Sequence, residues 1–281
     1  MSTMQEFNGR RVLVTGGAKG IGRETVRLFA QHGARVAMTG RDTGALQRQA
    51  EQFAREGLEV LALAGDVTSL EDCRAVIRST VEQFGGLDVL VNNAGMSMRG
   101  MFEQTSLELF RTVVDINFTG AVSMTRLALP ELLQSRGSVV FVSSLSGLRG
   151  LPGIAPYSAA KMALTGFSQA LRCELSPRGV HVGILYVSFT ENDNGKTIYD
   201  AEGNRIRLQR ARNSSTQFDV ARAVVHMVRR RRRSVIMTPL GKLAALAYTL
   251  LPGLSERLIT RFAARSDLYG TAAKAANGGS T

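Results

Sequence analysis

Residues 11–22 read Arg-Val-Leu-Val-Thr-Gly-Gly-Ala-Lys-Gly-Ile-Gly, a short apolar run that leads directly into a glycine-rich turn. The aliphatic residues predict a buried strand, and residues 23–32 after the turn favour a helix. Glycines let the backbone turn tightly and approach a phosphate, while the start of the helix offers unpaired N–H groups and a positive dipole end. The stretch therefore predicts the first half of a dinucleotide-binding unit.

Similar apolar runs recur along the chain and alternate with longer helical segments. Further strands are predicted at 34–39, 59–64, 86–91, 138–142, 180–186 and 235–238. This alternation is typical of parallel strands joined by helical crossovers. We therefore expect an α/β fold with a Rossmann-type, doubly wound parallel sheet of about seven strands and helices on both faces.

The chain has 281 residues, enough for one large α/β domain. We expect residues 1–239 to form a single dinucleotide-binding catalytic domain. Within it, the polar stretch 191–215 is predicted to be a substrate lid, because loops of this kind commonly order around a ligand, and a solvated loop is the alternative. Residues 240–281 are predicted to form an amphipathic C-terminal extension with a disordered tail.

The net charge of +12 includes an arginine run at 229–233. Such a balance favours phosphate-bearing partners, which are a cofactor, an anionic membrane or nucleic acid. No nucleic-acid-binding module is recognisable, so nucleic acid is not a predicted partner. No metal-ligand spacing is recognisable either, so no bound metal is predicted. The scattered Cys73 and Cys173 indicate a reducing compartment, and the first ten residues lack an apolar signal region. A cytoplasmic location is therefore expected.

The pair Tyr157 and Lys161 carries the chemistry that the sequence predicts. Residues four apart project from one face of a helix. An ammonium beside a phenol favours the phenolate and lowers the pKa of the phenol from about 10, which allows proton exchange near neutral pH. Taken alone, the spacing is common, and a half-buried tyrosine beside a solvated lysine is the alternative interpretation.

Four motifs together resemble the short-chain dehydrogenase/reductase family over residues 7–186. They are the TGxxxGxG turn, the segment Asn92-Asn93-Ala94-Gly95, Ser144, and the Tyr157 and Lys161 pair. The resemblance implies that the tyrosine exchanges a proton with the substrate oxygen and that the serine positions this oxygen. It also implies that the lysine lowers the tyrosine pKa and holds the nicotinamide ribose.

Two further catalytic assignments follow from the resemblance. Asn117 is expected to hold a water that connects the active-site lysine to solvent. Without such a role, an asparagine in the middle of a helix is mildly unfavourable for helix stability, because its side chain competes for backbone hydrogen bonds. It falls in the segment 106–134, which is predicted to form two helices bent at Gly120, with Asn117 on the first. Ser144 stands at the family's interval from the tyrosine, but Ser143 and Ser146 are alternatives, because hydroxyls at a strand end also cap turns.

The end of the second strand predicts the cofactor. An NAD enzyme usually has an acid there to bind the ribose 2′-hydroxyl. Thr39 takes that place without a competing acid, and Arg41 follows with a guanidinium that suits a 2′-phosphate. Lys19 resembles the extra basic residue of NADP-preferring members, although either cation alone is equally well explained as a solvated surface charge. NADP(H) is therefore the predicted cofactor.

The remaining cofactor contacts come from the resemblance. Asp66 is expected at the adenine amino group, with an N-cap of the next helix as the alternative, and Val67 is expected on the ring. The family's Pro-Gly is missing after the sixth strand, and Thr190 and Asn192 are alternative partners of the carboxamide. The predicted cofactor-binding residues are Gly16, Lys19, Gly20, Ile21, Gly22, Arg41, Asp66, Val67, Asn93, Ala94, Gly95, Tyr157, Lys161 and Thr190.

The predicted activity is the NADP(H)-dependent interconversion of a ketone and a secondary alcohol. The gap between tyrosine and lysine resembles carbonyl reducers. The extension and the missing Pro-Gly favour an apolar carbonyl, as in reductases of 3-ketosphinganine or of steroids. The alternatives are an NADP(H)-binding sensor or scaffold without turnover and, third, a nucleic-acid binder. Family members pair through the long helices after the fourth and fifth strands, so a homodimer or homotetramer is expected.

The C-terminal extension has its own pattern of leucines and arginines from Leu240 onward. Pro252 interrupts its longest apolar run, which is too short to span a bilayer. Two alternatives remain for this segment. It packs on the protein or on a neighbouring subunit, or it makes peripheral contact with an anionic membrane surface.

Overall fold

The computed structural model describes residues 6–191, 193, 196–207 and 215–265. Seven strands form one sheet in the order β3-β2-β1-β4-β5-β6-β9, and every neighbouring pair is parallel. The strands are β1 (Arg11–Thr15), β2 (Arg35–Gly40), β3 (Val60–Ala64), β4 (Val89–Asn92), β5 (Ser138–Ser144), β6 (His181–Val187) and β9 (Ser234–Ile236). The doubly wound Rossmann-type fold predicted from the sequence is confirmed.

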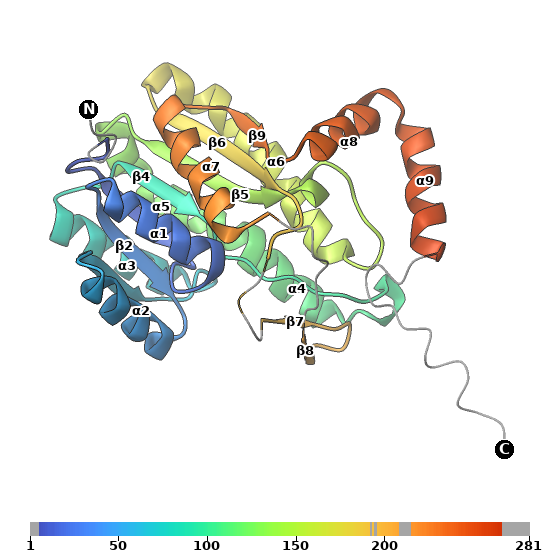
Figure 1. Ribbon diagram of the computed structural model, residues 1–281, viewed down its shortest axis with the longest axis horizontal. Coiled ribbons are helices and arrows are strands. Elements are labelled where there is room, and N and C mark those ends of the chain that lie inside the picture. Colours follow the sequence, from blue (N-terminus) through green and yellow to red (C-terminus); the bar gives the residue numbers. More distant parts are fainter. Residues whose placement is uncertain (1–5, 192, 194–195, 208–214, 266–281) are drawn as a thin grey trace.

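Helices cover both faces of the sheet (Figure 1). One face packs against α1 (Gly20–Gln31), α2 (Thr43–Arg55) and α7 (Gln217–Arg230), and the other against α3 (Leu70–Phe84), α5 (Gly120–Gln134) and α6 (Ala155–Leu175). Successive side chains of β1 show why both faces need covering. Val12 and Val14 belong to one core cluster and Leu13 to the other, and all three are fully buried.

Each predicted strand overlaps an observed one, and the largest difference is at the fourth. The sequence predicts a strand from Gly86, but β4 begins at Val89. Gly85 and Gly86 have φ values of 77° and 137°, which belong to a turn and favour glycine. The chain therefore enters the sheet later than its apolar pattern indicates.

Asp88, just before β4, joins the starts of three central strands. Its carboxylate accepts hydrogen bonds from the backbone N–H of Arg11 at 2.9 Å and from Nε of the same arginine at 2.7 Å. Its backbone carbonyl accepts from the N–H of Ser138 at 2.8 Å. Burial alone would raise the pKa of Asp88, but the hydrogen bonds and charge of Arg11 outweigh it and hold the pKa below its usual value. The carboxylate thus stays charged and fixes the relative positions of β1 and β4.

The segment 106–134 corrects one expectation. A π-helical turn, Asp115–Thr119, joins α4 (Leu107–Val114) to α5, so the irregularity lies before Gly120 and not at it. Asn117 lies in this turn, whereas the sequence predicted it on the first helix. Its Nδ2 donates to the carbonyl oxygens of Val113 at 2.9 Å and Met96 at 2.8 Å. Competition from such a side chain for nearby backbone acceptors is a physical reason for the interruption.

The predicted lid is described only in part. It contains an antiparallel pair, β7 (Thr197–Tyr199) and β8 (Arg205–Arg207). Asn192, one of the two alternatives for the carboxamide contact, lies outside the described residues, as does the predicted disordered tail 270–281. The two cysteines are not bonded to each other, since Cys73 is buried and Cys173 is exposed.

Two helices follow the sheet, α8 (Pro239–Leu250) and α9 (Pro252–Arg265), and they extend away from it at the right of Figure 1. The Thr238 hydroxyl caps α8 by accepting from the N–H of Gly241 at 3.1 Å. No helix within the described ranges is both long and apolar enough to cross a membrane. The predicted amphipathic extension is therefore a pair of short helices.

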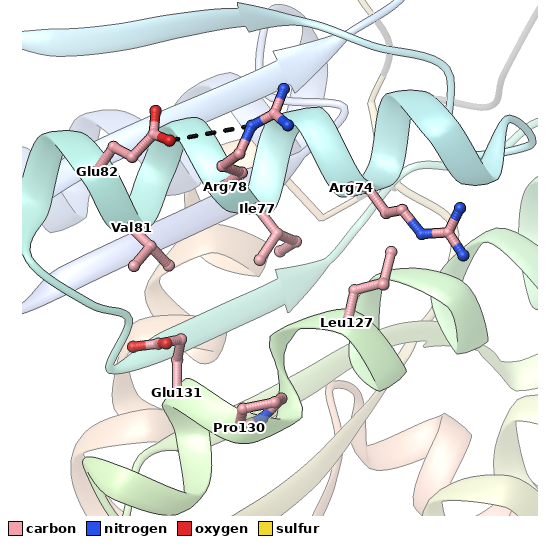
Figure 2. A pocket seen from close by; sticks show the side chains of 8 residues that line it. All are labelled: Arg74, Ile77, Arg78, Val81, Glu82, Leu127, Pro130 and Glu131. Atoms are coloured by element: carbon pink, nitrogen blue, oxygen red, sulfur yellow. Dashed lines mark ion pairs between the residues drawn. The ribbon is translucent and has the colours of Figure 1, made fainter.

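A smaller hollow of about 270 Å³ lies between α3 and α5 (Figure 2). Charged side chains ring it, and the Arg78 and Glu82 pair on α3 is 4.0 Å apart. None of its lining residues also lines the large cleft described below. The hollow therefore belongs to the outer face of these two helices.

The glycine turn brings α1 unusually close to the sheet. Gly16 and Gly20 have φ values of 66° and 56°, in the left-handed region that favours glycine. At Gly22, a Cβ would overlap the carbonyl oxygen of Gly16 and come within 2.6 Å of Nδ2 of Asn93. Any side chain at position 22 would therefore push the helix away from the turn.

We expect Gly22→Ala to destabilise the fold by about 1–3 kcal/mol, because the added methyl group meets backbone that has no room to move. Gly253→Ala is the matched control, since Gly253 is exposed on α9 with no other atom within 4 Å of the added carbon. The control should change stability by at most about 1 kcal/mol. Urea unfolding followed by circular dichroism measures both, and equal midpoints for the two variants would contradict the close approach.

Candidate active site

A cleft of about 1540 Å³ opens at the carboxyl ends of the central strands. It exceeds the roughly 300–1000 Å³ of typical small-molecule sites, so it has room for two ligands. All the predicted catalytic and cofactor-binding residues line it except Gly22, which packs beneath the turn. The structure thus brings together motifs that are far apart in the sequence.

Hydrogen bonds join the Asn-Asn-Ala-Gly segment to the glycine turn. The buried hydroxyl of Thr15 accepts from the N–H of Asn93 at 3.0 Å and from that of Ala94 at 2.9 Å. Nδ2 of Asn93 donates back to the carbonyl oxygen of Thr15 at 2.9 Å. The two motifs are therefore held side by side at the ends of β1 and β4.

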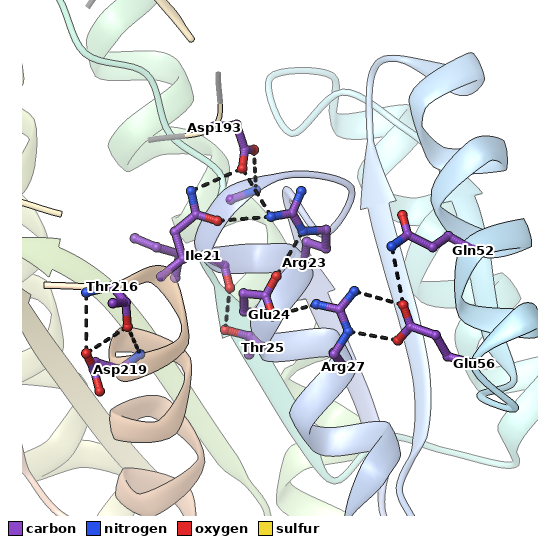
Figure 3. A network of polar contacts seen from close by, with 12 residues as sticks. Ile21, Arg23, Glu24, Thr25, Arg27, Gln52, Glu56, Asp193, Thr216 and Asp219 are labelled. Carbon is purple, nitrogen blue, oxygen red and sulfur yellow. Dashed lines mark hydrogen bonds and ion pairs between the residues drawn. The ribbon is translucent and has the colours of Figure 1, made fainter. Parts of the chain in front are cut away.

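The start of α1 has no cap from its own N-cap residue, Lys19. Instead the N–H of Gly20 donates to Oδ2 of Asp193 at 2.9 Å. Oδ1 of Asp193 accepts from Nη2 of Arg23 and from Nε2 of Gln217, both at 3.1 Å (Figure 3). Sequence reasoning missed this network, because its members come from three segments and share no motif.

The part of the cleft beside the glycine turn and the end of β2 carries two cations and two acids. Nζ of Lys19 lies 3.1 Å from Oδ2 of Asp42, and Nη1 of Arg41 lies 3.6 Å from Oδ2 of Asp66. Thr39 is buried. The expectation that no acid competes with the cations needs correction, because Asp42 also lines this end of the cleft. Its carboxylate accepts from the N–H of Ala45 and from Lys19, which lower its pKa.

Asp66 and Val67 line the same end. Oδ1 of Asp66 accepts from the N–H and the hydroxyl of Thr68, at 2.9 and 2.8 Å. The N-cap of α3 is Ser69, so the capping alternative for Asp66 is wrong. Val67 packs against Gly120, where a Cβ would come within 2.8 Å of the valine side chain.

Tyr157 and Lys161 lie one turn apart on α6 and both face the cleft. Nζ of Lys161 is 5.6 Å from the centroid of the tyrosine ring. The lysine is 4% exposed and donates to the carbonyl oxygen of Val142 at 3.0 Å. Burial lowers the pKa of Lys161 to about 8. A buried amine thus lies behind a half-buried phenol, as the spacing predicts.

The three candidate serines differ in accessibility. Ser143 is buried, and its hydroxyl points to the carbonyl oxygen of Lys161 at 3.4 Å. Ser146 is also buried. Ser144 is half-buried, and its Oγ accepts from the N–H of Ser146 at 3.3 Å, which leaves its proton available to donate. Ser144 therefore has the most accessible hydroxyl of the three.

Asn117 is buried behind this group. Its Oδ1 has no hydrogen-bond partner among the described residues. A Cβ on Gly95 would come within 2.7 Å of this oxygen and 3.6 Å of Nζ of Lys161. Glycine at position 95 therefore leaves space between the amide oxygen and the ammonium, and an acceptor left unpaired in a buried place indicates a bound polar group.

Thr190 lines the cleft beyond β6. It is buried, and its hydroxyl donates to the carbonyl oxygen of Ser188 at 3.1 Å. Of the two carboxamide alternatives, only this residue belongs to the described part of the chain.

The geometry fits a nicotinamide dinucleotide. Gly16 and Gly22 form a cradle that a Cβ would fill, α1 presents its N-terminus there without a cap of its own, and the cleft is large. At the nicotinamide end, the phenol, ammonium and hydroxyl groups provide a proton donor and a site for a polarised oxygen. The arrangement can therefore support hydride transfer coupled to proton transfer.

Comparisons with known proteins agree with this geometry. The sequence pattern of the short chain dehydrogenase family matches residues 10–203. An L-fucose dehydrogenase from Bos taurus is 38% identical over 186 residues, which are 66% of this chain and 67% of that protein. The 11-beta-hydroxysteroid dehydrogenase 1A of Arabidopsis thaliana is 37% identical over 264 residues, which are 90% of this chain and 75% of that protein.

A solved structure is similar as well. A dehydrogenase/reductase from Sinorhizobium meliloti 1021 superposes with a TM-score of 0.73 at 29% identity, covering 84% of this chain and 96% of that one. The family match takes in the glycine turn, the Asn-Asn-Ala-Gly segment and the Tyr157 and Lys161 pair. This chain therefore belongs to the short chain dehydrogenase family, whose members are oxidoreductases that use a nicotinamide cofactor.

Proposed function

We propose that the protein is an NADP(H)-dependent reductase that interconverts a ketone and a secondary alcohol. The observation that carries this proposal is the buried amine of Lys161 behind the phenol of Tyr157, in the same cleft as the glycine turn. A protein that only binds the cofactor has no need of this pair. Turnover of a carbonyl with NADPH therefore tests the proposal directly.

The side chains divide the chemistry among them. The bound cofactor supplies the hydride. Tyr157 donates a proton to the carbonyl oxygen, and the Ser144 hydroxyl donates a hydrogen bond that positions this oxygen. The ammonium of Lys161 stabilises the phenolate that remains and holds the nicotinamide ribose. Asn117 holds a water beside the lysine, through which the proton is replaced from solvent.

The rest of the cleft holds the dinucleotide. The turn from Gly16 to Gly22 surrounds the pyrophosphate with backbone N–H groups, and 93–95 flank the nicotinamide ribose. Asp66 and Val67 receive the adenine. Thr190 bonds to the carboxamide.

The preference for NADP(H) depends on two exposed cations. Arg41 and Lys19 lie at the end of the cleft where the ribose 2′-phosphate of NADP(H) would bind. Both have acidic neighbours in the structure, but a phosphate with two negative charges attracts them more strongly than a single carboxylate does. Asp42 and Asp66 then serve to orient the cations.

An apolar carbonyl suits the substrate end of the cleft. Its lining includes Leu151, Ile154 and Phe189, and the segment 191–215 is proposed to cover the substrate as a lid. One relative is named a hydroxysteroid dehydrogenase and another a fucose dehydrogenase. A steroid is largely apolar, whereas a sugar is polar. The lining favours an apolar ketone over a sugar.

Assembly and membrane contact complete the proposal. Copies pair through α5 and α6 into a homodimer or homotetramer, and light scattering of the purified protein measures the molar mass of the assembly. The exposed Leu250 and Leu251, where α8 meets α9, are proposed to rest on an anionic membrane surface, which would attract the cations of these two helices. Absence of sedimentation with anionic vesicles would remove this contact.

Tyr157→Phe should lower kcat by about 10²–10⁴-fold, because the proton donor is lost, while the Kd for NADPH changes little. Tyr186→Phe is the control, since its hydroxyl bonds to Thr165 at 3.3 Å and does not line the cleft. Full turnover in the first variant would remove the tyrosine from its role. NADPH binding by the wild type without turnover of any carbonyl or alcohol would favour the sensor alternative.

Arg41→Ala should weaken NADPH binding about tenfold to a hundredfold, the range expected for losing a charge-assisted hydrogen bond. The affinity for NADH should stay nearly unchanged, because NADH has no 2′-phosphate. Arg55→Ala, on the exposed end of α2, corrects for the general loss of positive charge. Titration followed by cofactor fluorescence measures all three proteins, and equal losses for both cofactors would contradict the assignment.

The rate of carbonyl reduction should fall as pH rises through about 8, where Lys161 loses its proton in the free protein. Below this pH the ammonium is present and supports Tyr157. Lys161→Arg, whose guanidinium stays charged, should have a lower maximal rate but retain it to higher pH. Profiles of kcat/KM against pH measure this difference, and identical falls in both proteins would show that another group titrates.

A further inference from the structure

We propose that α8 and α9 form one wall of the substrate site and bind an aliphatic chain of the carbonyl substrate. The proposal rests on the proposed function, because it takes Tyr157 as the reacting end of the cleft. It adds a substrate class, a ketone that carries an unbranched hydrocarbon chain, and it assigns the residues that select it.

The two helices share the cleft with the catalytic group. Their side chains lie in the same continuous cavity as Tyr157 and Ser144. The residues that they contribute are Leu240, Ala244, Ala247, Tyr248, Ser255, Leu258 and Ile259. A pocket confined to the glycine turn and the catalytic residues would not reach this far, so the cavity extends beyond the space that a cofactor needs.

The wall is almost wholly hydrocarbon. None of the seven residues is charged, and the hydroxyl of Ser255 already donates to the carbonyl oxygen of Ala247 at 3.1 Å. Among the described side chains of these helices, the cationic ones, Lys242, Arg257 and Arg261, do not line the cleft. A ligand that lies along this wall therefore gains mainly from removing apolar surface from water.

Apolar residues from the body of the protein contribute to the same cavity. Leu151, Pro152 and Ile154 precede or begin α6, and Phe189 follows β6. Together with Leu258 they provide apolar surface from separate segments of the chain. A hydrocarbon chain suits a cavity with these apolar walls better than a compact polar substrate does.

The pair of helices is anchored in this position. Nη2 of Arg149, in the loop after β5, donates to Oε2 of Glu256 on α9 at 2.9 Å. Gly241 packs so closely on the loop that a Cβ would come within 3.1 Å of Leu145. Both contacts lead to the segment that follows Ser144, so the wall has a defined position relative to the reacting group.

Some of the wall is exposed before a ligand binds. Leu240 and Leu258 are 76% and 56% exposed, although both line the cavity. Leu243 and Leu254, on the same two helices, are 63% and 52% exposed but lie outside the cavity lining. The chain thus offers two pairs of exposed leucines on the same two helices, of which one pair lines the cavity and the other does not.

The test compares methyl pentyl ketone with methyl nonyl ketone as substrates of NADPH oxidation. Burial of a methylene is worth roughly twofold to fourfold in kcat/KM, so the wild type should prefer the longer ketone by roughly fifteenfold or more. The double variant Leu240→Ser and Leu258→Ser should lose at least about fivefold of this preference, because the hydroxyls lie along the chain. Leu243→Ser with Leu254→Ser should keep the wild-type preference.

Calorimetric binding of methyl nonyl ketone to the protein saturated with NADP⁺ gives a second readout that needs no turnover. The cavity-lining variant should bind it more weakly, and the control variant should bind it as the wild type does. Unchanged chain-length preference and unchanged binding in the cavity-lining variant would overturn the proposal, as would equal losses in the control. If the wild type binds the ketone but reduces neither substrate, the proposed activity is wrong. The comparison of ketone binding by the two variants then still tests whether α8 and α9 bind the aliphatic chain.

Discussion

The site depends on one physical constraint: the ammonium group of Lys161 is buried in a part of the protein that water hardly reaches. Lys161 has little access to water, and burial lowers its pKa to about 8. The surroundings accommodate it closely: Val142 offers its carbonyl oxygen, and Gly95 leaves space beside Asn117. At Gly147 a Cβ would come within 2.8 Å of the lysine carbonyl oxygen. Glycine is therefore needed at position 95 beside the amine and at position 147 beside the backbone that carries it.

Much of the fold was predictable, because strands buried on both faces of a parallel sheet consist of short runs of aliphatic residues. The Tyr157 and Lys161 pair and the glycine turn were predictable for a similar reason, since each is a local pattern. Asp193 and Gln217 were not, because they contact Gly20 and Arg23, which lie 173 and 194 residues earlier in the sequence. Asp42 follows Arg41 directly in the sequence, but only the structure shows its contact with Lys19. The π turn around Asn117 also has no periodic signal, since it depends on where one amide finds acceptors.

The family match and the proposed apolar wall occupy different stretches of this chain. The family match ends at residue 203, and α7, β9, α8 and α9 all follow it. The catalytic group thus lies on the shared framework, whereas the apolar wall comes from the segment outside it. The steroid-named relative from Arabidopsis thaliana aligns with 90% of this chain, whereas the fucose dehydrogenase aligns with 66%. Under the proposal, the segment after the family match therefore adds a wall to a substrate site whose other apolar residues lie within the match.

The contact between Asp193 and Gly20 has a consequence for the order of events at the cleft. A carboxylate and a diphosphate carry the same sign of charge and compete for the same N–H group at the start of α1. With the diphosphate at the proposed position, the two would therefore exclude each other there. Lys196 and Thr197, close after Asp193 in the sequence, line the same cleft. Thermodynamic linkage makes the effect reciprocal. A ligand that changes the affinity for the dinucleotide by moving Asp193 has its own affinity changed by the dinucleotide by the same factor.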